Sequence, residues 1–434
     1  MIAVSSWGRL SKEPHKVVPC STESQLIDAI KTSRPGVAFG NGRSYGDACL
    51  NQGGFLWLSE GLDYLKAFDR KTGRLTCEAG VLLRDIQDLV VPEGWMLPVT
   101  PGTQLITVGG AIANDVHGKN HHRSGSFCDH VVRLKLVRTT GETIDCAPDH
   151  NSLWFAATVG GIGLTGVIVE AELQLKKISG PWLSAETIPY ANIGEFFKLA
   201  DASEADWEHT VSWIDCLPGN GGRGLFMRAN HSSDHGVLSP QKSKKSRIPF
   251  VPPISLVNNL TLKPFNEFYY WMGQRKTERP ELIHYQPFFY PLDNLQDWNK
   301  MYGPRGFYQY QSVVPRDVGE DAIAEMLKEI GRAGEGSFLA VLKTFGNRES
   351  LGILGFPKPG VTLALDFPNK GLRTVKLFER LDEIVTQAKG RIYLAKDARM
   401  SKKLFESGYP RFQELINYRD PGVSSEMSRR LLGF

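Results

Sequence analysis

Three glycine-rich connections in the first half of the chain constrain its fold more strongly than any other sequence feature. They read FGNGRSYG at 39–46, PGTQLITVGGAIANDVHGKNHHRSG at 101–125 and TVGGIGLTG at 158–166. Closely spaced glycines let a backbone approach a ligand or another segment tightly. One such loop is usually a simple turn. Three in one domain, each with hydroxyl side chains, predict the wall of one extended cofactor site.

The first of these loops departs from the dinucleotide-binding fingerprint. Its glycines give GxGxxxG in place of GxGxxG, and the following DACLNQGG does not predict a helix. The loop instead presents successive backbone N–H groups beside Arg43 and Ser44, which suits a pyrophosphate. The sequence therefore argues against a Rossmann domain.

Hydrophobic periodicity predicts an α+β protein of two domains. The first part predicts helices at 22–33, where Thr22 and Gln25 suggest a capping box, and at 81–90, and strands at 36–39, 54–58, 75–78, 131–138 and 166–175. KISGPW at 177–182 breaks the pattern and predicts a boundary. Beyond it, strands at 284–290, 307–314, 338–345 and 361–367 alternate with helices at 321–333 and 372–388, which predicts an antiparallel sheet with helices. Periodicity does not assign the segment after 391 to either domain.

Composition excludes several classes of protein. A chain of 434 residues, 41% hydrophobic and 23% charged, is globular and long enough for two domains. A net charge of +4 is too small to indicate a nucleic-acid binder. The six cysteines lack metal-binding spacing and predict free thiols in a reducing compartment. Because neither a signal peptide nor a stretch of about 18 apolar residues is found, we expect a cytoplasmic protein without a transmembrane helix.

The segment at 240–276 differs from both domains. It joins a basic cluster to prolines and large apolar groups, among them Lys242, Lys244, Lys245, Arg247, Phe250, Phe265, Phe268, Tyr269, Tyr270 and Trp271. Basic residues beside aromatic ones are what contact with a lipid surface requires. The alternative is a surface loop whose aromatic side chains fold back on the second domain.

Histidines at 117, 121 and 122 follow the second glycine pair. The spacing of His117 and His121 resembles the zinc motif HExxH, but the glutamate is missing, and the glycine and asparagine between them disfavour a helix. No metal is therefore expected. The residue types favour a flavin site with a positioned His117 and Lys119, and a histidine held by backbone groups is the alternative.

The glycine-rich stretches carry a resemblance to a known family. GNGRSYGD at 40–47, the second loop extended to 127, and TVGGIGLTG resemble the PCMH-type FAD-binding domain of vanillyl-alcohol-oxidase relatives. More closely, the chain resembles the flavin subunits of decaprenylphosphoryl-β-D-ribose 2′-epimerases, which oxidise the ribose 2′-hydroxyl before a separate reductase completes the inversion. The likeness extends through SSWGR at 5–9, FFYPLDNLQDWNKMYGPRGFYQYQSVVP at 288–315, FLAVLKTFG at 338–346, LALDFP at 363–368 and RIYLAKDARM at 391–400.

The resemblance implies an FAD-binding domain at 1–180 that is completed by 391–434, and a substrate domain at 181–390. It implies FAD without a covalent link, because members with covalent flavin carry a histidine in the first loop, where this chain has Arg43-Ser44-Tyr45. The implied cofactor-binding residues are Gly40, Asn41, Gly42, Arg43, Ser44, Tyr45, Thr103, Thr107, Gly109, Gly110, Ala113, His117, Gly118, Asn120, Gly160, Gly163, Gly166, Ile168 and Tyr393.

The resemblance also implies a sugar site and its catalytic groups. The implied substrate-binding residues are Lys119, Gln309, Gln311, Lys343, Thr362, Ala364 and Lys396. Oxidation of an alcohol by flavin needs a base for the hydroxyl proton and a cation near the reduced ring. We expect Lys396 beside the flavin and His117 and Lys119 at the sugar, and the sequence leaves open which of them is the base.

The implied activity is oxidation of a polyprenylphosphoryl-β-D-ribose to its 2′-keto form, the first half of epimerisation to the arabinose form. The implied partners are the lipid-linked pentose, a short-chain reductase and, through 240–276, a membrane surface that holds the protein peripherally; nucleic acid is not expected. A sugar-alcohol or aldonolactone oxidase of the same fold, active on soluble substrates, is the alternative. A third hypothesis is a protein that binds a carrier lipid or a partner without turnover.

Two positions depart from the mycobacterial members of this family. Those members have a cysteine where this chain has Ala364 and an asparagine where it has Thr362. Both positions are expected to border the substrate pocket, so the departures bear on the identity of the sugar or its carrier. The missing cysteine predicts resistance to inhibitors that capture that thiol covalently.

Overall fold

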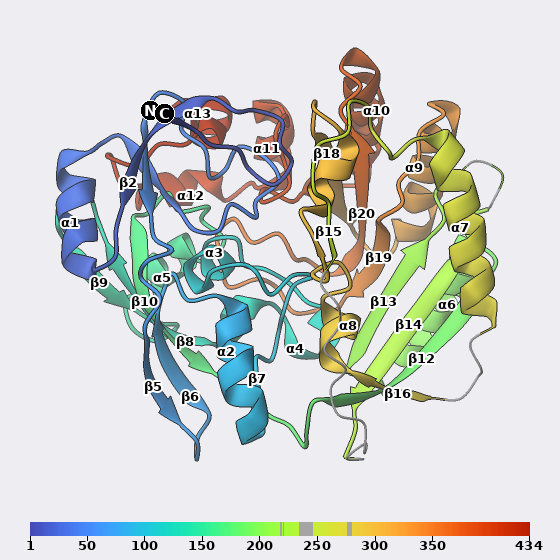
Figure 1. The fold of residues 1–434 in the computed structure, drawn as a ribbon, viewed down its shortest axis with the longest axis horizontal. Helices are drawn as coiled ribbons and strands as arrows, with labels where there is room; N and C mark the ends of the chain where they lie inside the picture. Colours follow the sequence, from blue (N-terminus) through green and yellow to red (C-terminus); the bar gives the residue numbers. More distant parts are fainter. Residues whose placement is uncertain (218, 220, 234–245, 276–279) are drawn as a thin grey trace.

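The structure is a computed structural model that describes residues 1–217, 219, 221–233, 246–275 and 280–434 (Figure 1). Its first lobe contains two larger sheets and a small one of β7 (Trp95–Met96) and β11 (Lys176–Lys177). One has the order β1 (Ile2–Ala3), β2 (Pro14–Pro19), β4 (Phe55–Leu58), β3 (Gly36–Phe39), with β4 parallel to both neighbours. The other is antiparallel, with the order β5 (Leu65–Asp69), β6 (Arg74–Glu78), β10 (Val167–Gln174), β8 (Val131–Val137), β9 (Thr143–Cys146).

The helices of this lobe occupy the connections between strands. They are α1 (Glu23–Thr32), α2 (Leu83–Val90), α3 (Val108–Ala113), α4 (His121–Ser124) and α5 (Ser152–Thr158). Helix α1 begins where the capping box was predicted, since the Thr22 side chain accepts from the N–H of Gln25 at 3.2 Å. The Gln25 side chain, however, accepts from the N–H of Ser21 at 2.9 Å, one residue before the cap.

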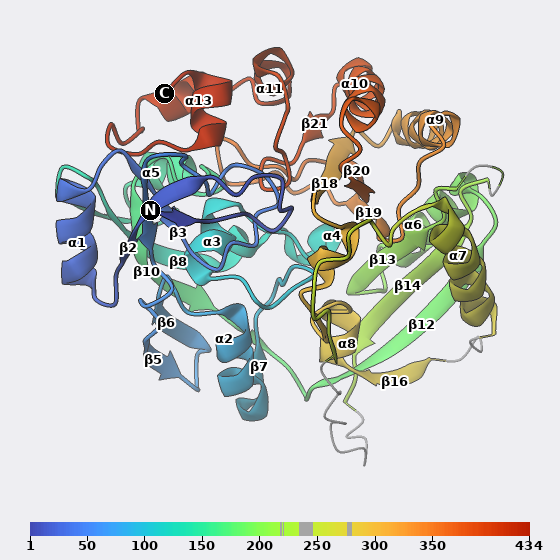
Figure 2. The same cartoon turned by 45° about the horizontal axis from the view of Figure 1, so that its top comes forward.

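The second lobe is built on one antiparallel sheet of eight strands. Their order is β16 (Glu281–His284), β12 (Trp182–Tyr190), β14 (Gly224–His231), β13 (His209–Ile214), β19 (Ala340–Phe345), β20 (Gly360–Pro368), β18 (Phe307–Val314), β21 (Arg391–Ile392). Helices α6 (Ile193–Ser203), α9 (Gly319–Arg332) and α10 (Leu372–Gln387) cover one face, and Figure 2 shows α9 and α10 lying over β18, β19 and β20. Helix α7 (Asn259–Gln274) packs against Trp213 and Leu225 on the other face.

Alternation along the strands separates the two faces of this sheet. Leu363, Leu365 and Phe367 point toward the helices and are almost fully buried in the main core together with Phe378 of α10. Thr362 and Ala364 point to the opposite face. The strands therefore contribute core packing with one set of positions and a polar surface with the other.

One predicted strand is wrong. Residues 284–290 were expected to be extended, but β16 ends at His284 and helix α8 (Tyr285–Phe289) follows. The His284 ring accepts from the N–H of Gln286 and so caps this helix. Phe288 and Phe289 pack against Leu183 in a small core of their own. A short apolar run does not distinguish a strand from a buried helix, which explains the error.

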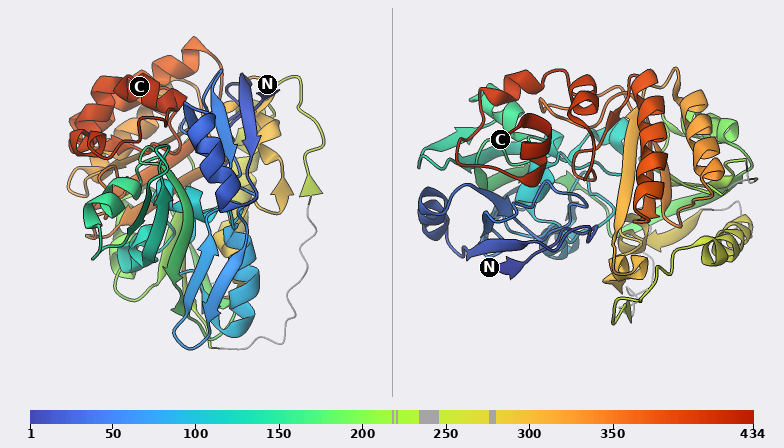
Figure 3. Two further views of the ribbon diagram at one scale, coloured as in Figure 1. Left: turned by 90° about the vertical axis from the view of Figure 1, so that its left-hand side faces the viewer. Right: turned by 90° about the horizontal axis from the view of Figure 1, so that it is seen from above.

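The segment after residue 391 contacts both lobes. Strand β21 forms an edge of the large sheet, and helix α11 (Lys402–Gly408) packs against β21 and α10. Helices α12 (Phe412–Ile416) and α13 (Glu426–Leu432) follow, and α13 contacts the first lobe, where the N–H of Glu426 donates to Leu50 O at 2.8 Å (Figure 3). The N–H of Ser424 donates to Gly36 O at 2.9 Å, and the N–H of Thr139 donates to Asp420 at 2.6 Å. Among the described residues, no helix is both long and apolar enough to cross a bilayer.

Candidate flavin site

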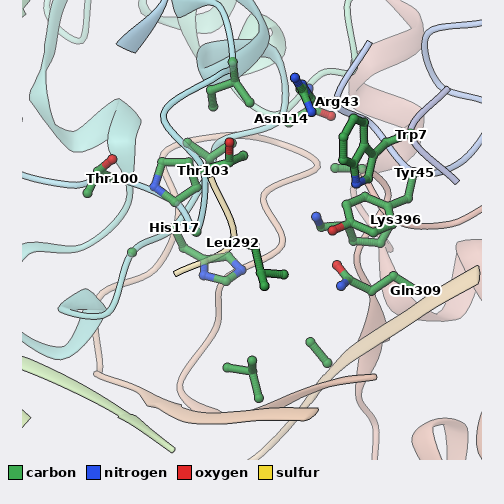
Figure 4. Close-up of a pocket in the computed structure, with 18 of the residues that line it drawn as sticks. Trp7, Arg43, Tyr45, Thr100, Thr103, Asn114, His117, Leu292, Gln309 and Lys396 are labelled. Atoms are coloured by element: carbon green, nitrogen blue, oxygen red, sulfur yellow. The ribbon is translucent and has the colours of Figure 1, made fainter. Parts of the chain in front are cut away.

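A cavity of about 740 Å³ lies between the two lobes. The three glycine-rich loops form one wall, and the polar face of the large sheet forms the other. In Figure 4, Arg43, Trp7, Tyr45, Lys396 and Gln309 follow one another along one side of this cavity. A volume of this size is within the usual range for small-molecule and cofactor sites, roughly 300–1,000 Å³.

The first glycine loop presents unpaired polar groups to the cavity. The backbone N–H groups of residues 41–44 donate to no acceptor in the described part of the chain. Arg43 stacks on the Trp7 ring at 4.0 Å, and its buried Nε has no hydrogen-bond partner. A side chain at Gly40 would place Cβ 2.5 Å from Thr107 Oγ1. The loop thus has the donors and positive charge that a pyrophosphate requires.

The other two loops leave room for a flat ligand. A Cβ at Gly102 or Gly163 would meet no atom within 4 Å, so both positions open onto the cavity. Gly109 lies against Ala79, with its N–H donating to Ala79 O at 2.7 Å. The buried Oδ1 of Asn114 has no hydrogen-bond partner. Open glycine backbone and orphaned polar atoms together fit FAD.

The structure brings most of the expected cofactor residues to this cavity. Its lining includes Gly40, Asn41, Gly42, Arg43, Ser44, Tyr45, Thr103, Thr107, Gly109, Gly110, Ala113, His117, Gly118, Gly163, Gly166, Ile168 and Tyr393. Asn120 and Gly160 lie outside the lining. Asn120 Nδ2 donates to Pro98 O at 2.8 Å, and Gly160, at φ +65°, donates its N–H to Ile112 O at 3.0 Å. Both residues therefore support the shape of the loops.

Three lysines converge on the cavity. Lys119 Nζ donates to Phe288 O and lies 4.5 Å from the centre of the Phe288 ring. Lys343 Nζ donates to Gly118 O at 3.0 Å. Lys396 Nζ lies 3.7 Å from the centre of the Tyr45 ring. Each ammonium group therefore contacts an aromatic ring or a backbone carbonyl of the cavity wall.

Burial changes the charge state of these lysines. It lowers the pKa of Lys119 to about 7. It also lowers the pKa of Lys343 to about 7, and the neighbouring charges of Lys119 and Lys396 act in the same direction. Burial also lowers the pKa of Lys396 to about 7, although the charge of Asp366 acts in the opposite direction. Groups that titrate near neutral pH can both hold and accept protons, as acid and base catalysis requires.

His117 lies at the centre of this polar network. Its Nδ1 is 3.0 Å from Lys343 Nζ, and its Nε2 is 3.0 Å from Gln311 Nε2. Its ring packs between Phe345 and Tyr393. Burial first and then the charge of Lys343 hold the pKa of His117 well below its usual value, so the imidazole is neutral.

The structure gives His117 and His121 different surroundings. His117 precedes α4 and His121 begins it, so they do not form an i, i+4 pair on one helix. An ammonium 3.0 Å from His117 also disfavours a cation there. Among the described residues, Glu208, His209 and His231 form the group whose metal-ligand atoms lie within 4.8 Å of one another. Its carboxylate is already paired with Lys176.

The remaining expected substrate residues lie on the sheet face. Gln309 and Gln311 alternate along β18, opposite Asp366 and Ala364 of β20. Gln311 Nε2 donates to Thr362 Oγ1 at 3.3 Å. All seven residues expected at the sugar line the cavity: Lys119, Gln309, Gln311, Lys343, Thr362, Ala364 and Lys396.

Sequence reasoning missed several residues at the site. Trp7, Asn114 and Leu292 line the cavity, and Asp366 accepts a hydrogen bond from Gln309. Trp7 and Leu292 are far in sequence from the glycine loops and carried no local signal. Asp366 could have been noticed, because a charged residue between Leu365 and Phe367 must face away from the core.

Comparison with known proteins identifies the family of this chain. Residues 14–147 match the FAD binding domain model. The chain is 34% identical to decaprenylphosphoryl-beta-D-ribose oxidase of Mycolicibacterium smegmatis over 98% of its own length and 96% of that protein. This chain belongs to that oxidase family. It is an FAD-dependent oxidoreductase, as the resemblance predicted, and the α+β fold with a PCMH-type domain is confirmed.

Other relatives cover less of the chain. An uncharacterized protein of Streptomyces coelicolor is 30% identical over 81% of this chain and all of its own length. L-gulonolactone oxidase of Mus musculus is 27% identical over 31% of this chain and 30% of its own length. The likeness to the lactone oxidase is thus restricted to part of the chain.

Proposed function

We propose that this protein oxidises the 2′-hydroxyl of a polyprenylphosphoryl-β-D-ribose to the 2′-keto sugar, the first half of epimerisation to the arabinose form. The observation that carries this proposal is the cavity that joins the glycine-rich loops to three half-buried lysines and two glutamines. The lysines suit a substrate with a phosphodiester, and the glutamines suit sugar hydroxyl groups. FAD, when bound, accepts the hydride.

Different residues of the chain would bind the cofactor, take the proton and position the reacting groups. Residues 40–45 would hold the pyrophosphate, and Lys396 would lie beside the isoalloxazine. His117 and Lys119 face the sugar side, and a neutral Lys119 amine there can take the hydroxyl proton. Lys343 holds the His117 ring in place through Nδ1. The largely apolar walls would keep water away from the reacting carbon once substrate fills the cavity.

Helix α7 offers a path for the lipid chain. Phe265 and Tyr269 line the cavity together with Trp213 and Phe338. On the outside, α7 and the preceding segment expose large apolar side chains: Phe250, Ile254, Leu256, Leu260, Phe265, Phe268, Trp271 and Met272. This cluster supports the proposal that 240–276 holds the protein at a membrane surface, where the prenyl chain stays in the bilayer. Lys242, Lys244 and Lys245 lie outside the described residues.

The oxidase proposal is tested by anaerobic bleaching of the flavin absorption band. A prenylphosphoryl-β-D-ribose analogue is compared with free ribose, alditols and aldonolactones. Bleaching by the lipid-linked sugar alone is the expected result. Bleaching by free polyols would favour a sugar oxidase active on soluble substrates, and a preparation that neither carries nor takes up FAD would favour a binding protein. The 2′-keto product is then offered to a short-chain reductase, the proposed partner.

The membrane proposal is tested by sedimentation with vesicles that contain anionic lipid. Serine at Phe268 and Trp271 should abolish co-sedimentation, because both side chains are about half exposed on α7, at 58% and 44%. Leu372→Ser is the matched control, since Leu372 is 77% exposed at the start of α10, away from this cluster. Equal binding of all three proteins would contradict a contact through α7.

A further inference from the structure

Asp366 is a buried carboxylate that the roles described so far do not use. It follows Thr362 and Ala364 on the cavity face of β20, directly opposite Gln309 of β18. Its solvent exposure is 0%. Burying an ionised carboxylate is expensive unless the group is hydrogen-bonded and paired with a cation. The question is therefore which groups hold its charge.

Two donors contact this carboxylate, and one cation acts on it from beyond ion-pair distance. Gln309 Nε2 donates to Asp366 Oδ1 at 2.6 Å, and the Tyr302 hydroxyl donates to Oδ2 at 3.4 Å. The cation whose field acts on Asp366 is Lys396. Tyr45, whose ring carries the Lys396 ammonium, also experiences the Asp366 charge. Burial raises the pKa of Asp366 to about 7, and the two donors and the charge of Lys396 oppose that shift, which favours the ionised carboxylate.

The negative charge of Asp366 partly balances the positive groups around the cavity. Lys343 and neutral His117 feel the Lys396 charge from the far side of the cavity. Arg43 and Asp293 act on the Tyr45 side. Burial alone would drive Lys396 toward its neutral form, and Asp366 opposes that tendency.

We propose that Asp366 is a positioning residue that keeps Lys396 in its ammonium form inside the cavity, and thereby sets how readily the flavin accepts electrons. The inference rests on the proposed function in placing Lys396 beside the isoalloxazine. A retained positive charge there favours negative charge on the ring. Asp366 acts through Lys396 and does not touch the substrate.

The test uses the FAD-loaded protein with Asp366→Asn, which keeps the size of the side chain. Sulfite is the probe, because its addition bleaches oxidised flavin and leaves negative charge on the ring, so its affinity reports a nearby cation. At pH 7.5 we expect sulfite to bind roughly tenfold more weakly, which corresponds to a reduction potential lower by about 30 mV. The pH midpoint of sulfite binding should also move down.

Three further proteins make the result specific. Asp382 lies on α10, on the face of the sheet opposite the cavity, and pairs with Arg399. Asp382→Asn should therefore leave sulfite affinity unchanged. In a Lys396→Met background, Asp366→Asn should have no additional effect. Tyr302→Phe removes one donor to Asp366, keeps the ring stacked on Phe307 at 4.1 Å, and should weaken sulfite binding a few-fold even if Asp366→Asn does not fold.

The outcomes separate the two proposals. An unchanged sulfite affinity and potential in a folded, FAD-loaded Asp366→Asn protein would overturn the role of Asp366. An equal loss in the Lys396→Met background would show that Asp366 acts by another route, which also overturns it. Failure of the lipid-linked ribose to bleach the wild-type flavin would instead refute the proposed substrate, whatever the sulfite result.

Discussion

At the scale of single residues, Ala364 decides whether the cavity contains a reactive thiol. It lies opposite Gln311 and faces the space where the sugar is proposed to bind. Cys49 also lines the cavity, but burial raises the pKa of its thiol to about 12, which makes it a poor nucleophile.

We therefore expect the unmodified protein to resist inhibitors that capture an active-site thiol. Ala364→Cys should gain one covalent adduct, detected by intact-mass measurement after turnover with such an inhibitor. Cys49→Ser in the same background is the control and should keep that adduct. Labelling of the unmodified protein at Cys49 would show that the thiol is more reactive than its burial indicates.

The buried lysines should make the protein less stable at neutral pH. The pKa of Lys119 is about 7 in the folded chain against an ordinary value of 10.5. Between these values the unfolded chain binds a proton that the folded chain lacks, so stability rises with pH. Below about 7 the folded protein carries the full cost of the buried charge.

Lys119→Met should accordingly stabilise the protein by roughly 1–3 kcal/mol near pH 6, with the gain shrinking toward pH 10. Denaturant unfolding of both proteins across that range measures the difference. The lost donor to Phe288 O offsets part of the gain at every pH, so the slope is the decisive quantity. A difference independent of pH would contradict a titrating Lys119.

The sequence predicted the site residues that lie within recognisable local motifs. Residues 40–45 and the lysines at 119, 343 and 396 were expected at one site, and the structure places them around one cavity. Trp7 was missed because its role depends on which segment the fold brings beside the first glycine loop. Such pairings are set by the packing of the two lobes, and no window of sequence contains them.

At the scale of elements, α13 holds the first glycine loop in place. Arg430 of α13 bonds Asp47, at the end of that loop, through Nε at 2.9 Å and Nη2 at 2.8 Å. Its Nη2 also bonds Asp397 at 2.8 Å, one residue after Lys396. A single guanidinium thus ties the carboxyl-terminal helix to both sides of the cofactor wall.

Arg430→Met should leave two buried carboxylates facing each other, which typically costs about 3–5 kcal/mol. We expect a lower unfolding temperature and loss of FAD during gel filtration, measured by the ratio of flavin to protein absorbance. Arg411→Met is the matched control, because Arg411 pairs with Glu414 at the surface and should cost little. Full retention of FAD would contradict the bridging role.

Elements with strong alternation or amphipathic periodicity were predicted well. Strands β3 and β18 have the expected bounds, and α10 ends within one residue of the prediction. The run at 284–290 failed because His284 caps a helix whose aromatic side chains fill a small separate core. Local sequence did not show that this core existed.

At the scale of the whole molecule, the carboxyl-terminal segment completes the large sheet and also contributes to the cavity. Strand β21 pairs with β18, and Lys396 follows four residues later. A chain ending at residue 390 should therefore lose an edge strand, a cavity lysine and the helices that cover the first lobe. We expect it to be insoluble or free of FAD, as judged by the supernatant yield and its yellow colour.

The two faces of the large sheet separate two evolutionary demands. Thr362 and Ala364 both lie on the cavity face, whereas Leu363 and Leu365, which alternate with them, belong to the core. A mutation at Thr362 or Ala364 can therefore alter the cavity without replacing a core side chain of β20. Relatives that diverge in substrate can thus explore new sugars or carriers at little risk to their scaffold.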